Sequence, residues 1–149
     1  MATTASQQAP ASGTWTDRAA VTGEYALKVL AYTDCIKRTV EKAKEPGFNE
    51  SGWDEVAAML DTARFRRVGN DKADMGWEVY RGLLMQWGTT TDFWAEFHRI
   101  SQVGSRVFLE LTEHNTPRGG AESVVNSCTV YQFDEGGKLV QLGIYLQHD

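Results

Sequence analysis

The sequence has little cysteine, no long apolar run and no surplus of positive charge, and each absence excludes a class of protein. Its two cysteines, Cys35 and Cys128, show no metal-ligand spacing, so we expect a reduced, cytoplasmic protein. No apolar run approaches the roughly 20 residues of a membrane-spanning helix, so no membrane partner is expected. The net charge is -5 at pH 7, and the one tight basic cluster, RFRR at 64–67, is too small to neutralise a nucleic-acid backbone.

The composition indicates one globular domain behind a polar leader. Residues 1–16 lack the basic start and apolar core of a signal peptide, and we predict a disordered tail there. Residues 17–149 are predicted to form a single domain, because about 130 residues suffice for one hydrophobic core. The three histidines show no ligand spacing for zinc, and we predict neither a metal nor a cofactor.

The first half of the chain carries helical patterns. Apolar residues repeat at three- and four-residue steps over 17–44, which predicts a helix that ends near Pro46 and Gly47. A second helix is predicted after Ser51 as N-cap, and a third over 74–87 with Gly88 as its stop. A short strand is predicted at 63–68, between these two helices.

The second half predicts four long antiparallel strands. Segments 92–101, 105–115, 122–134 and 138–149 are rich in β-branched and aromatic residues, and glycine-containing turns separate them. Strands this long form a twisted, bent sheet, and the helical half is the material that can cover its apolar face. The sequence therefore predicts an α+β domain with three N-terminal helices packed on a strongly curved antiparallel sheet.

Two segments carry a resemblance to a known family. FHRISQVGSRVFLELTEHN (97–115) resembles the central hairpin of limonene epoxide hydrolases, and TVYQFDEGGKLVQLGIYLQ (129–147) resembles the last hairpin of the NTF2-like superfamily. That superfamily also includes ketosteroid isomerases and SnoaL-type polyketide cyclases. The resemblance covers about residues 20–148, and it implies a cone-shaped α+β fold and a homodimer that forms through the sheets.

The resemblance does not carry over the catalytic residues of these enzymes. Limonene epoxide hydrolases have Arg-x-Asp on the central strand and a second Asp on the last strand, where this sequence has Leu111-Thr112-Glu113 and Ile144. Ketosteroid isomerases have an acid on the penultimate strand at the position of Thr129, and their general base falls near Arg66 or Arg67. Neither mechanism is expected here in its familiar form.

Strand alternation, with its phase set by the resemblance, gives candidate site residues on the concave face of the sheet. His98 is the first acid–base candidate because its ordinary pKa suits proton transfer near neutrality. Glu113 and Glu96 are the others, since burial among apolar walls would raise the pKa of a glutamate. The expected substrate-binding residues are Tyr32, Arg66, Trp94, Leu111, Thr129, Tyr131 and Ile144. Each assignment has an alternative. The histidine can have a structural role, the glutamates and the arginine can be exposed to solvent, and the tyrosines can be ordinary members of the core.

Two functional hypotheses follow from an apolar cavity with a few polar groups. The first is a cofactor-independent enzyme that acts on a terpenoid, polyketide or steroid-like molecule by isomerisation, cyclisation, dehydration or epoxide opening. The second is a non-catalytic domain for small-molecule binding or dimerisation. On the convex face, Phe108, Cys128, Val130 and Tyr145 form an apolar patch, which predicts a symmetric homodimer.

Overall fold

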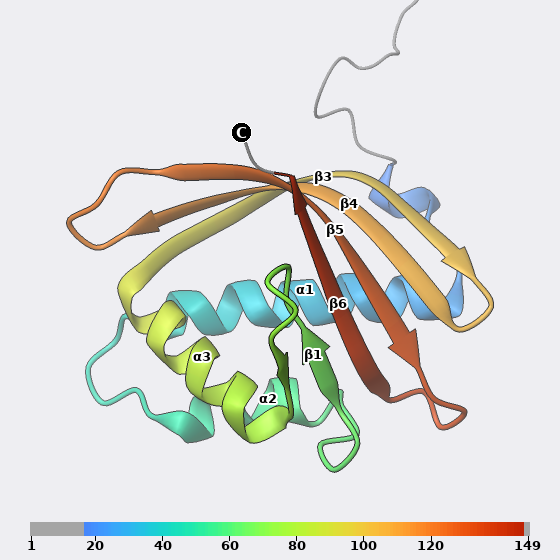
Figure 1. Cartoon of the computed structure of the whole chain (residues 1–149), viewed down its shortest axis with the longest axis horizontal. Helices are drawn as coiled ribbons and strands as arrows, with labels where there is room; N and C mark the ends of the chain where they lie inside the picture. Colours follow the sequence, from blue (N-terminus) through green and yellow to red (C-terminus); the bar gives the residue numbers. More distant parts are fainter. Residues whose placement is uncertain (1–16, 148–149) are drawn as a thin grey trace, which may run out of the picture.

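The structure, a computed structural model, describes residues 17–147, and the disordered tail predicted for 1–16 lies outside these residues. Helices occupy the first half of the chain and long strands the second, as predicted (Figure 1). In chain order the elements are η1 (Arg18–Ala20), α1 (Glu24–Lys42), η2 (Glu50–Trp53), α2 (Asp54–Ala57), β1 (Arg66–Val68), β2 (Asp74–Met75), α3 (Trp77–Thr90), β3 (Thr91–Val103), β4 (Arg106–Pro117), β5 (Ser123–Phe133) and β6 (Leu139–Gln147).

The strands form one six-stranded sheet in the order β2-β1-β6-β5-β4-β3. All neighbours are antiparallel except β1 and β6, which run parallel. The four long strands arch over α1, and α2 and α3 lie on the same side of the sheet (Figure 1). This arrangement confirms the predicted α+β class, with helices covering the concave face of a curved sheet.

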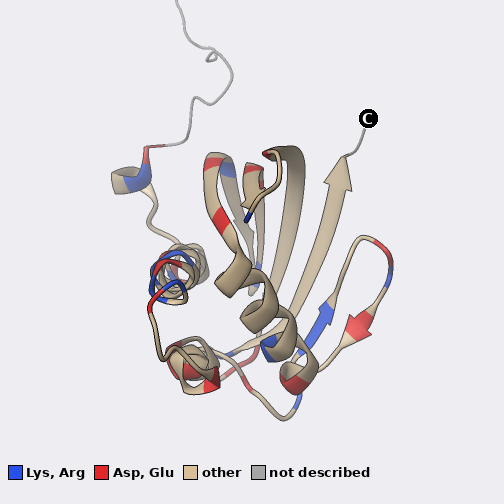
Figure 2. Cartoon of the chain, turned by 90° about the vertical axis from the view of Figure 1, so that its left-hand side faces the viewer, with Lys and Arg blue, Asp and Glu red and all other residues tan. Residues whose placement is uncertain are grey.

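The hydrophobic core fills the space between α1, α3 and this concave face. The periodic face of α1 is buried there, with Val29, Ile36 and Val40 in the core cluster beside Leu109 and Leu142 of the sheet. Burial of one such side chain contributes roughly 1.5–3 kcal/mol, so this face fixes α1 against the strands. In Figure 2 the ribbon of α1 also carries the colours of Lys and Arg and of Asp and Glu, at positions between those of its buried residues.

Several predicted helix boundaries are wrong, for local reasons. Ser51 is not an N-cap. The N-cap of η2 is Asn49, whose side-chain Oδ1 accepts a hydrogen bond from the backbone N–H of Ser51. The third helix begins at Trp77 rather than at residue 74, because Asp74 and Met75 pair with β1 as strand β2. In Figure 2 β1 appears blue beside the red of β2, where Arg66 Nε donates to Asp74 Oδ1 at 2.8 Å.

Gly88 does not end the third helix, which continues to Thr90. Gly88 is buried, and a Cβ at this position would lie 2.9 Å from Trp53 Cζ2. Trp53 is fully buried, so it has no room to move away. The glycine is therefore required by the close approach of α3 to Trp53 rather than by a helix stop.

Two glycines of α3 should respond to alanine in opposite directions. Gly82→Ala has no atom within 4 Å of the new Cβ, and it should stabilise the protein by up to about 1 kcal/mol through helix propensity. Gly88→Ala gains the same propensity but must displace Trp53, and overpacking costs about 1–3 kcal/mol, so it should be destabilising. Urea unfolding of both variants measures this, and two changes of the same sign would contradict the packing described.

Within residues 17–147, no helix is both long enough and apolar enough to cross a membrane.

Candidate functional site

A cavity of about 770 Å³ lies between the concave face of the sheet and helices α1 and α3. Its walls are largely apolar and aromatic, and its polar groups are few. Three of its lining residues, Arg18, Asp34 and Lys37, have charged side chains that are also exposed to solvent. The mouth of the cavity therefore lies beside α1. Apolar walls with a few convergent polar groups are the usual make-up of a small-molecule site.

Glu113 is the carboxyl group of the cavity interior. It lies on β4, and the register pairs it with Ala95 of β3, another lining residue. Its surroundings bury most of the side chain, and burial raises the pKa of Glu113 above the ordinary glutamate value. A hydrogen bond with Ser127 and the charge of Arg67 act in the opposite direction without cancelling the effect of burial. The carboxyl group therefore holds its proton to a higher pH than an exposed glutamate.

Three tyrosines surround the same part of the cavity. The hydroxyl groups of Tyr32 on α1 and Tyr80 on α3 are 2.9 Å apart, in a buried hydrogen bond. The ring of Tyr131 packs edge-on against Tyr32 with centroids 5.8 Å apart. Burial raises the pKa of all three phenols, so they stay protonated and can donate hydrogen bonds. Whichever hydroxyl donates in the Tyr32–Tyr80 pair, the other keeps a proton for a further acceptor.

Arg67 brings a positive charge to this group of phenols. Its guanidinium carbon lies 5.6 Å from the centroid of the Tyr80 ring, a cation–π contact. Arg67 Nε is buried and has no hydrogen-bond partner within the described part of the chain. The charge of Arg67 is among the influences on the pKa values of Tyr32, Tyr80 and Glu113, which places these groups around one region.

The other end of the cavity is aromatic. The rings of Trp87 and Phe93 meet edge to face with centroids 5.0 Å apart. Trp87 Nε1 donates to Asn115 Oδ1 at 2.9 Å, which fixes the indole. The amide NH2 group of Asn115 has no acceptor among residues 17–147 and can donate to a ligand. This end offers apolar surface with a single polar edge.

Among residues 17–147, no three His, Cys, Asp or Glu side chains are grouped so that they could hold a metal ion.

The predicted phase of the first long strand is wrong for Trp94, Glu96 and His98. Phe93, Ala95 and Phe97 face the cavity instead, because they pair with Asn115, Glu113 and Leu111. The register shifts between Phe97 and Arg99, a β-bulge at His98. One extra residue reverses the alternation, so the even-numbered positions Ile100 and Gln102 face inward only after the bulge.

Trp94, Glu96 and His98 instead contact polar neighbours on the convex face. Glu96 Oε2 is 2.7 Å from His114 Nε2, and the Trp94 ring stacks on His114 at a centroid distance of 3.8 Å. His98 Nε2 is 2.7 Å from Thr112 Oγ1, which donates to Asn126 Oδ1 at 2.8 Å. Trp94 and Glu96 also border the cavity at the sheet edge that β3 forms, but their side-chain partners lie on the other face.

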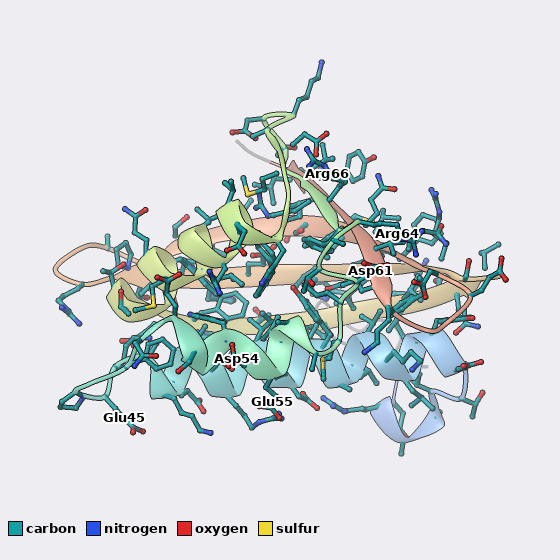
Figure 3. All side chains as sticks on the ribbon, turned by 90° about the horizontal axis from the view of Figure 1, so that it is seen from below. Glu45, Asp54, Glu55, Asp61, Arg64 and Arg66 are labelled. Carbon is teal, nitrogen blue, oxygen red and sulfur yellow. The ribbon has the colours of Figure 1, made fainter. Side chains whose placement is uncertain are left out.

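Arg66 is also misplaced by the sequence prediction. It pairs with Gln141 in the register and is held by Asp74 at the surface, whereas its neighbour Arg67 pairs with Leu142 and lines the cavity. Figure 3 shows Arg66 on β1, with Asp54 and Glu55 on the outer face of α2. The signal for the correct phase was Phe65, whose buried side chain shares a face with residue 67 by strand alternation.

The remaining substrate-binding candidates do line the cavity. They are Tyr32, Leu111, Thr129, Tyr131 and Ile144. Sequence reasoning did not single out Tyr80, Asn115 or Arg67 as site residues. Tyr80 lies within the predicted third helix. Its hydrogen bond to Tyr32, 48 residues earlier in the sequence, depends on contact between two helices.

Several solved structures have folds similar to that of this chain. An NTF2-like protein of unknown function from Exiguobacterium sp. 255-15 matches with a TM-score of 0.66 at 12% identity, covering 82% of this chain and 99% of that one. A putative SnoaL-like polyketide cyclase from Shewanella putrefaciens CN-32 gives 0.68 at 8%, covering 87% and 83%. An LEH-like epoxide hydrolase from M. tuberculosis gives 0.56 at 22%, covering 76% and 84%. No protein-family model matches the sequence, and no curated protein matches it.

The chain thus has the NTF2-like fold, with a cavity inside its cone. This fold supports many chemistries, so the activity has to be argued from the side chains in the cavity.

Proposed function

We propose that the protein is an acid–base enzyme that acts on a hydrophobic small molecule in the cavity. The observation that carries this proposal is Glu113, a carboxyl group buried among apolar and phenolic walls with its pKa raised by that burial. A structural glutamate has no need of such a position, since burying an unpaired carboxylate costs stability. Perturbed carboxyl groups inside cavities are typical of catalytic sites.

Glu113 supplies the proton transfer. Catalysis by a general acid or base is most effective when the pKa of the group lies near the working pH, and burial moves Glu113 in that direction. Its carboxylate can accept a proton from substrate carbon or water, and its acid form can return one. His98, the first candidate from the sequence, lies on the convex face and has no part in this step.

The phenols and Thr129 supply hydrogen bonds to a substrate oxygen. Tyr32 and Tyr80 share one hydrogen bond and keep one proton to donate, and Thr129 lines the cavity from β5. Donors fixed in a largely apolar cavity stabilise charge that develops on a carbonyl or epoxide oxygen. Isomerisation, cyclisation, dehydration and epoxide opening all need such a donor together with a proton-transfer group. The similar structures described as a putative SnoaL-like polyketide cyclase and an LEH-like epoxide hydrolase support this range of reactions.

The experiment is a substrate panel of three chemical classes: terpenoid epoxides, β,γ-unsaturated cyclic ketones and linear polyketone analogues. Products are followed by mass spectrometry in two series, one with the enzyme in molar excess and one with the substrate in molar excess. We expect catalytic turnover of at least one class. Saturable binding of these compounds without conversion of any would contradict the enzyme, and it would favour the second hypothesis, a non-catalytic small-molecule-binding domain.

We further propose that two copies pair through the convex face. Trp94, Val124 and Tyr145 lie on this face and are 47%, 55% and 64% exposed. Large apolar side chains gathered on one face indicate an interaction surface. Light scattering should give a dimer for the wild type and a monomer for Tyr145→Glu. Val79→Glu is the control, because Val79 is 62% exposed on α3 and lies away from the sheet. A wild-type monomer at working concentration would contradict the proposal.

A further inference from the structure

Arg67 and the hydroxyl groups of Tyr32 and Tyr80 form a polar region of the cavity, and the Trp87–Phe93 pair forms an aromatic region at the other end of α3. Tyr80 and Trp87 both lie on α3, seven residues apart, which corresponds to about 10 Å along a helix. A ligand that spans the cavity must therefore be amphipathic, with a polar group at one end of an apolar ring system.

Arg67 has a charge that the protein leaves unpaired. Among residues 17–147, no carboxylate lies within ion-pair distance of its guanidinium, whereas Arg64 and Arg66 both have such partners. Asp71, which like Arg67 flanks Gly69, uses its carboxylate to accept the Ala73 amide instead. An unpaired charge whose Nε is buried and unbonded is costly, and a negatively charged ligand in the cavity would balance that charge.

The geometry points to a substrate that carries a carboxylate, and we propose that Arg67 binds it while the apolar rings lie against Trp87 and Phe93. This inference rests on the proposed function, because it names the substrate class of the same cavity. The two terminal Nη groups of a guanidinium form a planar fork that matches the two oxygens of a carboxylate, while Nε of Arg67 is covered by the protein. One guanidinium balances one negative charge, and the spare proton of the Tyr32–Tyr80 pair adds a neutral donor.

This placement leaves Glu113 free for the reaction. The ligand carboxylate occupies Arg67, and the body of the ligand then lies between the tyrosines and Trp87, along the wall that Glu113 and Asn115 share with Phe93 and Ala95. The reacting atoms are therefore expected between the carboxylate and the ring end of the substrate.

The test is a binding measurement with two matched probes, 2-naphthylacetate and 2-naphthylacetamide, which differ in charge and not in shape. Calorimetry on the full-length wild type should give at least about tenfold tighter binding of the carboxylate, the effect of one charge-assisted contact. Arg67→Gln should abolish this preference, because it weakens binding of the carboxylate more than binding of the amide. Arg66→Gln is the matched control, because Arg66 is an adjacent arginine held by Asp74 outside the cavity, and it should keep the preference.

Arg67→Lys guards against misfolding of the glutamine variant, since it keeps the charge and should retain a reduced preference. Equal affinity of the wild type for the two probes, no binding of either probe, or an unchanged preference in Arg67→Gln would each overturn the inference. Failure here is distinguishable from failure of the proposed function. The binding measurement does not depend on turnover, so it can fail or succeed independently of the substrate panel. Glu113→Gln should keep the preference for the carboxylate probe while losing turnover.

Discussion

Glu113→Gln should lower kcat/KM on the substrate found in the panel by at least about 100-fold, because general acid–base catalysis contributes about 10²–10⁴. Glutamine has nearly the same shape and can still hydrogen-bond Ser127, so the cavity should keep its form. What is lost is the ability to exchange a proton. Steady-state kinetics at a fixed pH measures the effect, with circular dichroism to verify the fold.

Glu96→Gln is the matched control for this prediction. Glu96 is a glutamate on the neighbouring strand, and its carboxylate contacts His114 on the convex face. We expect it to change kcat/KM by less than about threefold, since a group that does not reach the reacting atoms contributes no transition-state stabilisation. Equal losses for the two variants, or full activity in Glu113→Gln, would show that Glu113 is not the proton-transfer group.

The same substitution should stabilise the folded protein at neutral pH. Burial raises the pKa of Glu113 in the folded state above its unfolded value, so folding favours the neutral form. The stability that Glu113 contributes is therefore fully present below the unfolded pKa, about 4.3, and is lost as the pH rises through the higher pKa of the folded state. Glutamine does not ionise, so the gain in Tm of Glu113→Gln should be near zero at pH 4 and grow towards pH 8. A side chain that lowers stability while it serves activity is characteristic of a functional site.

Trp53→Ala should reduce the free energy of unfolding by about 3–5 kcal/mol, the usual cost of truncating a fully buried tryptophan. Trp53 has no exposed surface, and it joins the layers below the cavity by contacting Phe48 edge-on and lying against Gly88 of α3. Domains of this size are stable by only about 5–15 kcal/mol, so the variant should be close to unfolding at 37 °C.

Urea denaturation of Trp53→Ala and Trp94→Ala compares the same substitution at a buried and at a half-exposed tryptophan. Trp94 is 47% exposed and stacks on His114, so in the Tyr145→Glu background, where the proposed pairing of two copies is removed, its loss should cost only about 1 kcal/mol. If the two variants lose the same stability, Trp53 does not have the central packing role described for it.

The elements that the sequence predicted well are those with local signals. The turns at Gly104, Gly119 and Gly137 were predicted from glycine and polar clusters, and all three glycines have positive φ. The apolar period of α1 gave the buried face, because its spacing matches a helix turn. These signals need only a few neighbouring residues.

The phase of a strand depends on more distant information. The segment from Phe93 to Ile100 has apolar residues on both faces, so its composition alone cannot show which face is buried. The bulge at His98 then changes the phase midway, and a bulge is set by pairing with β4 rather than by the strand itself. For this reason the sequence prediction misplaced His98 on β3, whereas it placed Glu113 of β4 in the cavity.

The groups around Glu113 required the fold. Tyr32 and Tyr80 come from two helices, and Arg67 comes from a three-residue strand whose register is set by β6. Alternation from the buried Phe65 would have favoured Arg67 over Arg66, but the contact of Arg67 with Tyr80 depends on where α3 packs.

The measurement that tests the central claim most directly is the titration of the Glu113 carboxyl carbon by ¹³C NMR, with its signal assigned by its absence from Glu113→Gln. We predict a midpoint clearly above the ordinary glutamate pKa of about 4.3, because burial is the largest influence on this group. In Arg67→Gln the midpoint should rise further, since the positive charge of Arg67 acts to lower the pKa of Glu113. A midpoint at or below the ordinary value would mean that Glu113 is solvated or ion-paired, and the proposed acid–base site would be contradicted.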